Sequence, residues 1–183
     1  MVTRILLLFL VASPAFGAEV AGVKIDEQIR VAEAPLVLKG AGLRKRFFVQ
    51  VYAMGLYVAE RKADPVTQPG AKRVAIHMLR DVGADQFAEA LVDGMRPNHD
   101  EATMKSLASR IAQLVAIMAE MKVAKEGMAI TLDWIPDSGT QVTVAGKSSG
   151  KPIEGEDFYR GLLRIWLGEK PVQDDLKKAL LGG

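Results

Sequence analysis

The sequence predicts an α+β domain in which an antiparallel sheet carries helices packed against one face. Three observations predict it. Segments rich in β-forming residues come first, two segments with helical periodicity occupy the middle, and a further pair of strands followed by two helices closes the chain.

The clearest strand signal runs from Leu36 to Glu60, LVLKGAGLRKRFFVQVYAMGLYVAE. Val, Phe and Tyr are abundant there, and Gly40 and Gly42 interrupt the run. This composition predicts two strands joined by a tight connection near Lys45 and Arg46.

Within this pair of strands, Arg44 is a cation among apolar residues and therefore needs an anionic partner. It lies at a strand end, and Tyr52 is expected across from it on the next strand. On one straight strand the two residues would be about 26 Å apart. They can share a ligand only if the chain bends between them. The alternative is that Arg44 is a surface residue with no specific partner.

Other strands are predicted on both sides of the helical segments. The run VKIDEQIRVAE, which starts at Val23, alternates imperfectly and indicates one strand or a hairpin, and RVAIHML, which starts at Arg73, indicates another strand. The runs MAITLDWI and TQVTVAG flank a turn at Pro136–Gly139 and together predict a hairpin.

The helical period begins at Ala84, where Phe87, Leu91 and Met95 fall on one face. A second helix is predicted to start near Asn98, with Glu101 completing a capping box. Its apolar stripe is either ordinary core or the lining of a lipid tunnel, since methionine adapts to irregular apolar shapes. The stripe comprises Met104, Leu107, Ile111, Leu114, Val115, Met118 and Met121. Two closing helices are predicted over residues 156–167 and 174–181, separated by Gly168 and Pro171.

The first 17 residues have the pattern of a secretory signal. Arg4 precedes the apolar run ILLLFLVA, which is followed by Ser13, Pro14 and small residues, and the run is shorter than the ~20 residues of a membrane span. Cleavage is expected after Gly17, with Ala18 as a nearby alternative site and an uncleaved anchor as the other possibility. We therefore expect a periplasmic or secreted protein with a single domain over residues 18–183 and no stable membrane span after cleavage.

Composition excludes several classes of function. The chain has no cysteine, which excludes disulfides, thiol catalysis and a lipoprotein anchor. Without Arg4, 23 basic residues stand against 22 acidic ones, and this near neutrality argues against nucleic acid as a partner. The two histidines, His77 and His99, have no further ligands at metal spacing, so neither a metal nor another cofactor is expected. The GKS at Gly146 lacks the rest of a phosphate loop.

Two separated stretches resemble the chalcone isomerase-like superfamily. Its hallmark is a glycine pair, an arginine, a short connection and an F-x-x-x-[TY]-x-x-G-[VL]-Y strand. The matching residues here are Gly40, Gly42, Arg44, Phe48, Tyr52, Gly55, Leu56 and Tyr57. The run from Phe158 to Gly182 resembles the closing helices of exported bacterial members. The resemblance implies an open-faced sandwich, an antiparallel sheet with helices on one face.

The resemblance also implies which catalytic groups are missing. Plant chalcone isomerases combine the arginine with two threonines, a tyrosine and an asparagine that hold water and substrate. The resemblance places Tyr52 at the first threonine, Phe87 at the tyrosine, Gly94 at the asparagine and Ile165 at the second threonine. Only the arginine of the polar set remains, so no catalytic residue is assigned.

The fatty-acid-binding branch of the same fold keeps the arginine and has a tyrosine at the position of Tyr52, where the pair grips a carboxylate. The resemblance therefore implies non-catalytic binding of an apolar carboxylate such as a fatty acid, with Arg44 and Tyr52 as ligand-binding residues and Phe87, Gly94 and Ile165 lining the cleft. The connection between Arg44 and Phe48 is shorter than in plant sequences. The alternatives are an isomerase or intramolecular lyase acting on an unknown substrate, and an envelope protein whose cleft is vestigial.

Overall fold

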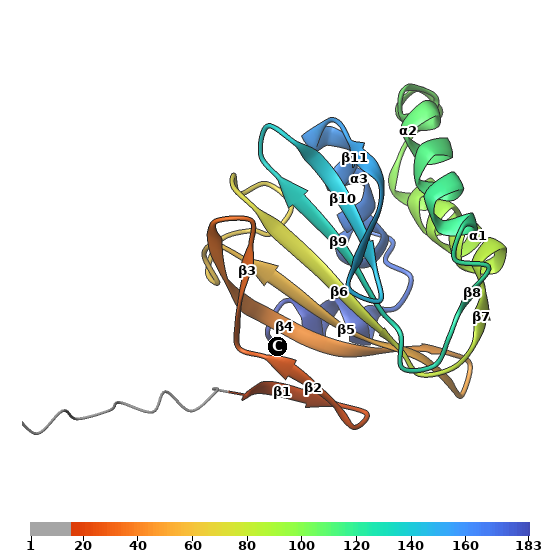
Figure 1. Ribbon diagram of the computed structural model, residues 1–183. Coiled ribbons are helices and arrows are strands. Elements are labelled where there is room, and N and C mark those ends of the chain that lie inside the picture. Colours follow the sequence, from red (N-terminus) through yellow and green to blue (C-terminus); the bar gives the residue numbers. More distant parts are fainter. Residues whose placement is uncertain (1–15) are drawn as a thin grey trace, which may run out of the picture.

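A curled, seven-stranded antiparallel sheet forms the centre of the molecule (Figure 1). The computed structural model describes residues 16–183. The strands of this sheet follow one another across it in the order β11-β10-β9-β6-β5-β4-β3. Their bounds are β3 Gln28–Val31, β4 Ala34–Arg46, β5 Val49–Val58, β6 Lys72–Met78, β9 Ala129–Ile135, β10 Gly139–Val144 and β11 Lys147–Ile153. The α+β fold class predicted from the order of segments is confirmed.

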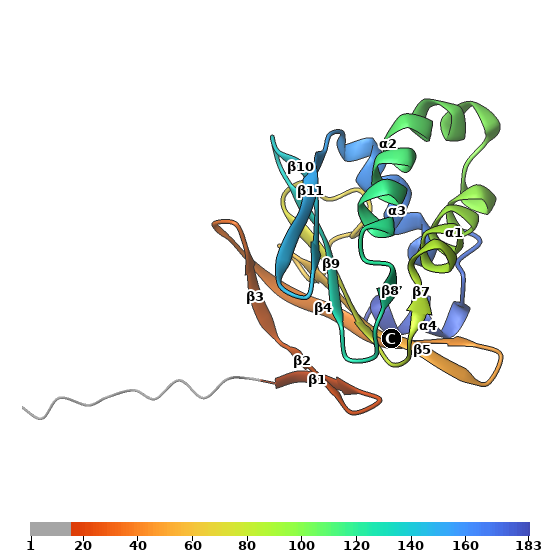
Figure 2. The ribbon, with the colours of Figure 1, turned by 45° about the vertical axis from the view of Figure 1, so that its right-hand side comes forward.

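Four α-helices contribute side chains to one large core cluster on one side of this sheet. They are α1 Ala84–Met95, α2 Glu101–Ala119, α3 Glu156–Leu167 and α4 Asp174–Leu180. A 3₁₀ turn, Arg96–Asn98, links α1 to α2. Two short strands, β7 Val82–Gly83 just before α1 and β8 Val123–Ala124 just after α2, pair with one another in a small antiparallel sheet. Figure 2 shows α3 between the sheet and the pair formed by α1 and α2. None of the helices in the described chain has the length and apolar character that a membrane crossing needs.

The first helix begins at Ala84 and has the buried face that its periodicity predicts, with Phe87, Leu91 and Met95 all buried. The predicted cap of the second helix is wrong by two residues. Asp100 is the N-cap, and its side chain accepts a hydrogen bond from the amide of Thr103 at 2.7 Å. A carboxylate is the better cap, because it also carries the charge that the helix dipole favours at this end.

The opposite face of the sheet is covered in part by a separate hairpin. Its strands are β1, Phe16–Val20, and β2, Val23–Asp26. The Tyr57 hydroxyl donates a hydrogen bond to the Asp26 carbonyl at 3.0 Å, which ties the hairpin to β5. The predicted signal peptide, residues 1–17, lies outside the described residues except for its last two positions, which belong to β1.

The glycine pair on β4 allows α4 to pack closely against the sheet. A Cβ atom at Gly40 would collide with the backbone oxygens of Ala179 and Leu180. One at Gly42 would lie 2.7 Å from Leu176 Cδ1 and 2.9 Å from Ala179 Cβ. These positions therefore exclude a side chain because a helix, rather than a ligand, approaches the strand.

Candidate functional site

Arg44 and Tyr52 lie directly opposite one another on β4 and β5. The two strands join through a two-residue loop of Phe47 and Phe48. The connection therefore lies two residues later than the predicted one at Lys45 and Arg46. The register shifts immediately after Arg44, which is a β-bulge. Bulges bend a strand and re-aim a side chain, and they are frequent beside functional sites.

Gln173, the N-cap residue of α4, holds the backbone on both sides of Arg44. Its Oε1 accepts from the amide of Lys45 at 2.8 Å, and its Nε2 donates to the carbonyl of Leu43 at 3.0 Å. The same Oε1 lies 3.4 Å from Arg44 Nη1, which also donates to the Lys45 carbonyl at 2.6 Å. The bonds to Lys45 and Gln173 both use Nη1, and Arg44 also forms a side-chain hydrogen bond with Tyr52. The Nε and Nη2 edge, which forms two-pronged bonds with carboxylates, takes no part in the bonds to Lys45 and Gln173.

Tyr52 is buried, and its hydroxyl accepts a hydrogen bond from Trp166 Nε1 at 2.9 Å. A phenol both accepts and donates, so this bond leaves the hydroxyl proton for another acceptor. Burial raises the pKa of Tyr52, while the hydrogen bond from Trp166 and the nearby Arg44 act in the opposite direction. The phenol is therefore neutral at physiological pH and acts as a hydrogen-bond donor.

A cavity of about 340 Å³ opens beside this pair. Most of its walls are apolar. They come from the β4–β5 hairpin, β7 and the residues before it, α1, α3 and the segment that precedes α4. The lining residues outside its charged groups are Phe47, Val49, Val51, Tyr52, Val82, Gln86, Phe87, Ala90, Leu91, Ile165 and Val172. The volume lies at the lower end of the roughly 300–1,000 Å³ found for small-molecule sites.

The charged residues of the cavity are three arginines and one aspartate. The arginines are Arg44, Arg46 and Arg80. Asp81 is engaged elsewhere, because its carboxylate accepts from Lys125 Nζ and from the amide of Glu126, both at 2.8 Å. The net field at this cavity is therefore positive and favours an anionic group.

Two of the three predicted cleft positions contribute side chains to the cavity. Phe87 and Ile165 line it, and the Phe87 ring lies 6.2 Å from that of Tyr52. Gly94 is not among the lining residues. It lies behind the wall, where an added Cβ would come within 2.7 Å of Ile165 Cγ2 and 3.0 Å of Val172 Cγ1.

The long helix α2 contributes no residue to this cavity. Leu107, Ile111, Leu114 and Met118 are buried in the main core. Of the two interpretations of the apolar stripe, the structure supports ordinary core for Leu107, Leu114 and Met118. Ile111 also lines an open groove between α1 and α2, together with Met104 and Val115 of the same stripe.

Sequence reasoning missed Trp166 and Gln173. The indole of a buried tryptophan needs an acceptor, so Trp166 could have been marked as a residue with a polar partner. Its partner, however, is 114 positions away in the chain. No local pattern marks Gln173, since glutamine is not a preferred N-cap residue.

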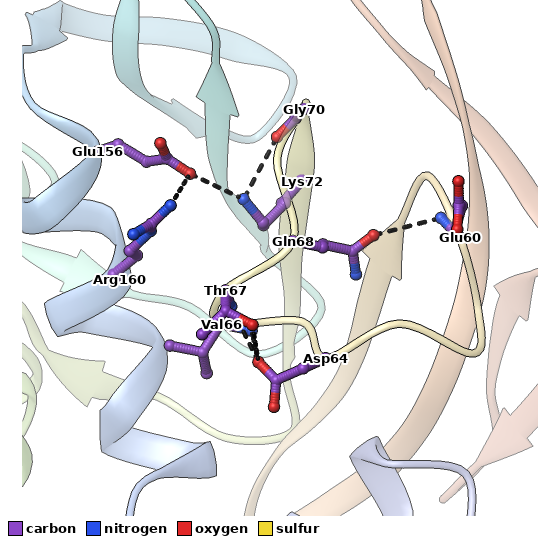
Figure 3. Close-up of polar contacts among 9 residues, drawn as sticks. All are labelled: Glu60, Asp64, Val66, Thr67, Gln68, Gly70, Lys72, Glu156 and Arg160. Carbon is purple, nitrogen blue, oxygen red and sulfur yellow. Dashed lines mark hydrogen bonds and ion pairs between the residues drawn. The ribbon is translucent and has the colours of Figure 1, made fainter.

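A buried cation, Lys72, lies at the end of β6 far from this site (Figure 3). Its Nζ is 3.3 Å from both Glu156 Oε1 and the Gly70 carbonyl, and Glu156 also pairs with Arg160 at 3.0 Å. Burial lowers the pKa of Lys72. Lys72 and Glu156 are not among the residues that line the cavity, and we assign this cluster to the structure of the fold. Across residues 16–183 no group of three or more metal-ligating side chains comes together.

Comparisons with known proteins agree with this architecture. The crystal structure of an Arabidopsis thaliana fatty-acid binding protein is similar, with a TM-score of 0.63, 16% sequence identity, and coverage of 87% of this chain and 92% of that one. At this identity the likeness concerns the fold. None of the curated proteins compared with the chain matches it. The sequence profile described as chalcone isomerase-like matches residues 17–182, and the chain therefore belongs to the chalcone isomerase-like family.

Proposed function

We propose that this protein binds a single-chain apolar carboxylate, such as a fatty acid, without converting it. The observation that supports this most directly is the pairing of Arg44 and Tyr52 across two strands at the wall of a mostly apolar cavity with a positive field. The Nε and Nη2 edge of Arg44 and the hydroxyl proton of Tyr52 together supply donors for both oxygens of a carboxylate. The similar structure from Arabidopsis thaliana is that of a fatty-acid binding protein, which agrees with this proposal.

The size of the cavity suggests the length of the ligand. Its volume of about 340 Å³ is roughly twice that of a ~150 Å³ apolar cavity that takes up the six carbons of benzene. We infer an acyl chain of roughly twelve carbons.

The tail supplies more of the binding free energy than the head group. About ten buried methylenes contribute on the order of 8 kcal/mol at ~0.8 kcal/mol each. A charge-assisted hydrogen bond contributes about 1.5–3 kcal/mol net. The carboxylate therefore fixes orientation and selects acids over neutral lipids, whereas the cavity selects chain length.

The test compares saturated acids with the corresponding alcohols by calorimetry or by displacement of a fluorescent fatty acid. Affinity for acids should rise with chain length and level off near twelve carbons, when the cavity is full. Arg44→Ala should weaken acids by roughly ten- to a hundredfold and leave alcohols nearly unchanged. Arg30→Ala is the matched control, because it removes the same charge from an exposed side chain on β3. Equal weakening of acids and alcohols, or no binding of either series, would overturn the proposed role of Arg44.

An isomerase remains the second candidate, since the same two donors can stabilise a phenolate or enolate oxygen. Against it, Phe87 and Ile165 offer no side-chain hydrogen bonds to a substrate or a water. We expect cyclisation of chalcone, followed by the loss of its absorbance, to proceed at the spontaneous rate. Turnover that Arg44→Ala abolishes would favour the isomerase.

We further propose that the protein is exported and works in the periplasm or outside the cell. The proposal rests on the signal pattern of residues 1–17. Intact-mass measurement on protein from its native host should give a chain that begins at Ala18 or Glu19. A mass that retains Met1 would contradict it.

A further inference from the structure

The tip of the β4–β5 hairpin exposes two aromatic side chains side by side. Phe47 is 85% exposed and Phe48 is 96% exposed, and the next residue, Val49, is 41% exposed. These three belong to the four large hydrophobic residues in the described chain that are exposed. In Figure 2 the hairpin projects from the sheet, which leaves the tip free to meet another surface.

The backbone at this tip is also unusual. Phe47 has a φ of +55°, a left-handed conformation that bulky residues rarely adopt. In a two-residue hairpin loop with positive φ at its first position, glycine is the favoured residue there. The loop thus holds an aromatic residue where a glycine would be less strained. Strain of this kind is concentrated at functional segments.

Basic residues lie next to the exposed rings in the chain and in the adjoining cavity. Lys45 and Arg46 precede them on β4 and are exposed, and Arg80 lines the same cavity as Arg46 and Phe47. Aromatic side chains at the tip with basic side chains behind them match the layers of an anionic bilayer, where apolar groups enter beneath charged head groups. A tip of two side chains is much smaller than the ~800 Å² that each partner commonly contributes to a stable protein interface.

We propose that the β4–β5 tip, defined as Lys45–Val49, docks the protein on the surface of an anionic lipid bilayer. Arg46, Phe47 and Val49 belong both to this tip and to the lining of the cavity. Docking therefore brings the cavity against the membrane, where an apolar ligand can pass between the two without crossing water. The docking itself does not depend on the proposed fatty-acid function, and its test contains no fatty acid.

The test measures binding to vesicles of phosphatidylcholine containing phosphatidylglycerol, and to vesicles of phosphatidylcholine alone, by co-sedimentation. The wild-type protein should bind the anionic vesicles, and added salt should weaken the binding. The double variant Phe47→Gly, Phe48→Ser should bind at least about tenfold more weakly, because it lacks both rings that enter the bilayer on docking. Its thermal stability should equal or exceed that of the wild type, since glycine suits the positive φ. Retained stability separates lost docking from misfolding.

Two double variants that remove the same charge test the basic residues of the tip. Lys45→Gln with Arg46→Gln should weaken binding by about fivefold for each charge removed. Lys62→Gln with Lys151→Gln removes the same charge from exposed residues near the other end of the sheet and should have little effect.

Site-specific labels can locate the contact, because the chain contains no cysteine. A polarity-sensitive fluorophore on Phe48→Cys should shift to the blue with anionic vesicles. The same fluorophore on Ser138→Cys, in the turn at the opposite end of the sheet, should not shift. Three outcomes would overturn the proposal: no vesicle binding by the wild type, binding that the Phe47→Gly, Phe48→Ser variant retains, or a tip-dependent dimer in light scattering, which would make a second copy of the chain the partner.

Discussion

Among single residues, Gly94 shows how a position outside the cavity can set its size. Its Cα faces Ile165 and Val172, and both of these residues line the cavity. The absent side chain allows α1 and α3 to approach closely. This helix contact determines the position of Ile165 and Val172 in the cavity wall.

We expect Gly94→Ala to narrow the cavity. The new Cβ would lie 2.7 Å from Ile165 Cγ2 and must displace it or the adjacent helix. Overpacking of this kind costs about 1–3 kcal/mol of stability. In the acid series, the chain length of best affinity should become shorter. Gly83→Ala is the control, because its Cβ would meet no atom closer than 3.8 Å. If a stable Gly94→Ala protein keeps the same dependence of affinity on acid chain length, Ile165 and Val172 can shift without narrowing the cavity.

At this scale the sequence predicts some residues better than others. Arg44 and Tyr52 are identifiable because a charged and a polar side chain in an apolar strand pair need partners, and both belong to the family pattern. The position of Gly94 behind the wall depends on how two helices pack. Gln173 depends on a contact with a strand 128 positions earlier. Such tertiary contacts leave no local signature.

Among the secondary-structure elements, the contact between β4 and α4 determines whether the site is assembled. Gly40 and Gly42 let the helix lie against the strand, and its N-cap residue Gln173 then reaches the backbone beside Arg44. The close approach of helix and strand thus has a direct consequence for the backbone that carries Arg44, the proposed ligand-binding residue.

We expect Gly42→Ala to destabilise the protein by about 1–3 kcal/mol through overpacking against Leu176 and Ala179. Gly40→Ala should cost more, because its Cβ meets the backbone of α4, whereas Leu176 can change rotamer. Unfolding in urea measures both. Ala179→Gly should restore part of the stability lost in Gly42→Ala, since it removes the opposing Cβ. Because glycine inside a helix itself costs about 1 kcal/mol, Ala179→Gly alone is the reference. If Ala179→Gly costs as much in the Gly42→Ala background as in the wild type, Leu176 alone opposes the new methyl group.

The elements themselves are largely predictable, because the helical period marks the start of α1 and the break at Gly168 and Pro171 marks the end of α3. The β4–β5 loop is displaced because its turn residues are two phenylalanines, which give no turn signal of the glycine, asparagine or aspartate kind. The residues of β11 are polar or small apart from its last, Ile153, so a strand there depends on pairing with β10 rather than on its own composition.

At the scale of the whole molecule, Lys72 makes the free energy of unfolding depend on pH in the alkaline range. Its side chain is fully buried, and burial lowers its pKa below the ordinary value. Between the folded and the unfolded pKa, the unfolded chain binds the proton that the folded chain has released. The contribution of Lys72 to stability therefore rises with pH across this window.

We expect Lys72→Met to be neutral or stabilising near neutral pH, since an apolar side chain avoids the cost of burying a charge and Glu156 keeps its contact with Arg160. The gain should shrink as pH rises through the lowered pKa. The comparison must be made as a difference between variant and wild type, because burial also raises the pKa of Tyr57 to about 12. Above pH ~10 such a tyrosine lowers stability in both proteins alike. Chemical unfolding across this range measures the difference, and a loss of several kcal/mol at neutral pH would show that the Lys72–Glu156 pair is net stabilising.

The bond between Gln173 and the strand that carries Arg44 also has a consequence for the order in which the protein is made. The strand leaves the ribosome early, but the glutamine that fixes it belongs to the last elements of the chain. The sheet from β3 to β11 precedes α4 in synthesis, so its strands can pair while Arg44 still lacks this support. In a chain that ends before residue 173, the backbone on both sides of Arg44 would therefore lack its hydrogen bonds to Gln173. Tight selection of the proposed anionic ligand would therefore begin only once α4 has packed against the sheet.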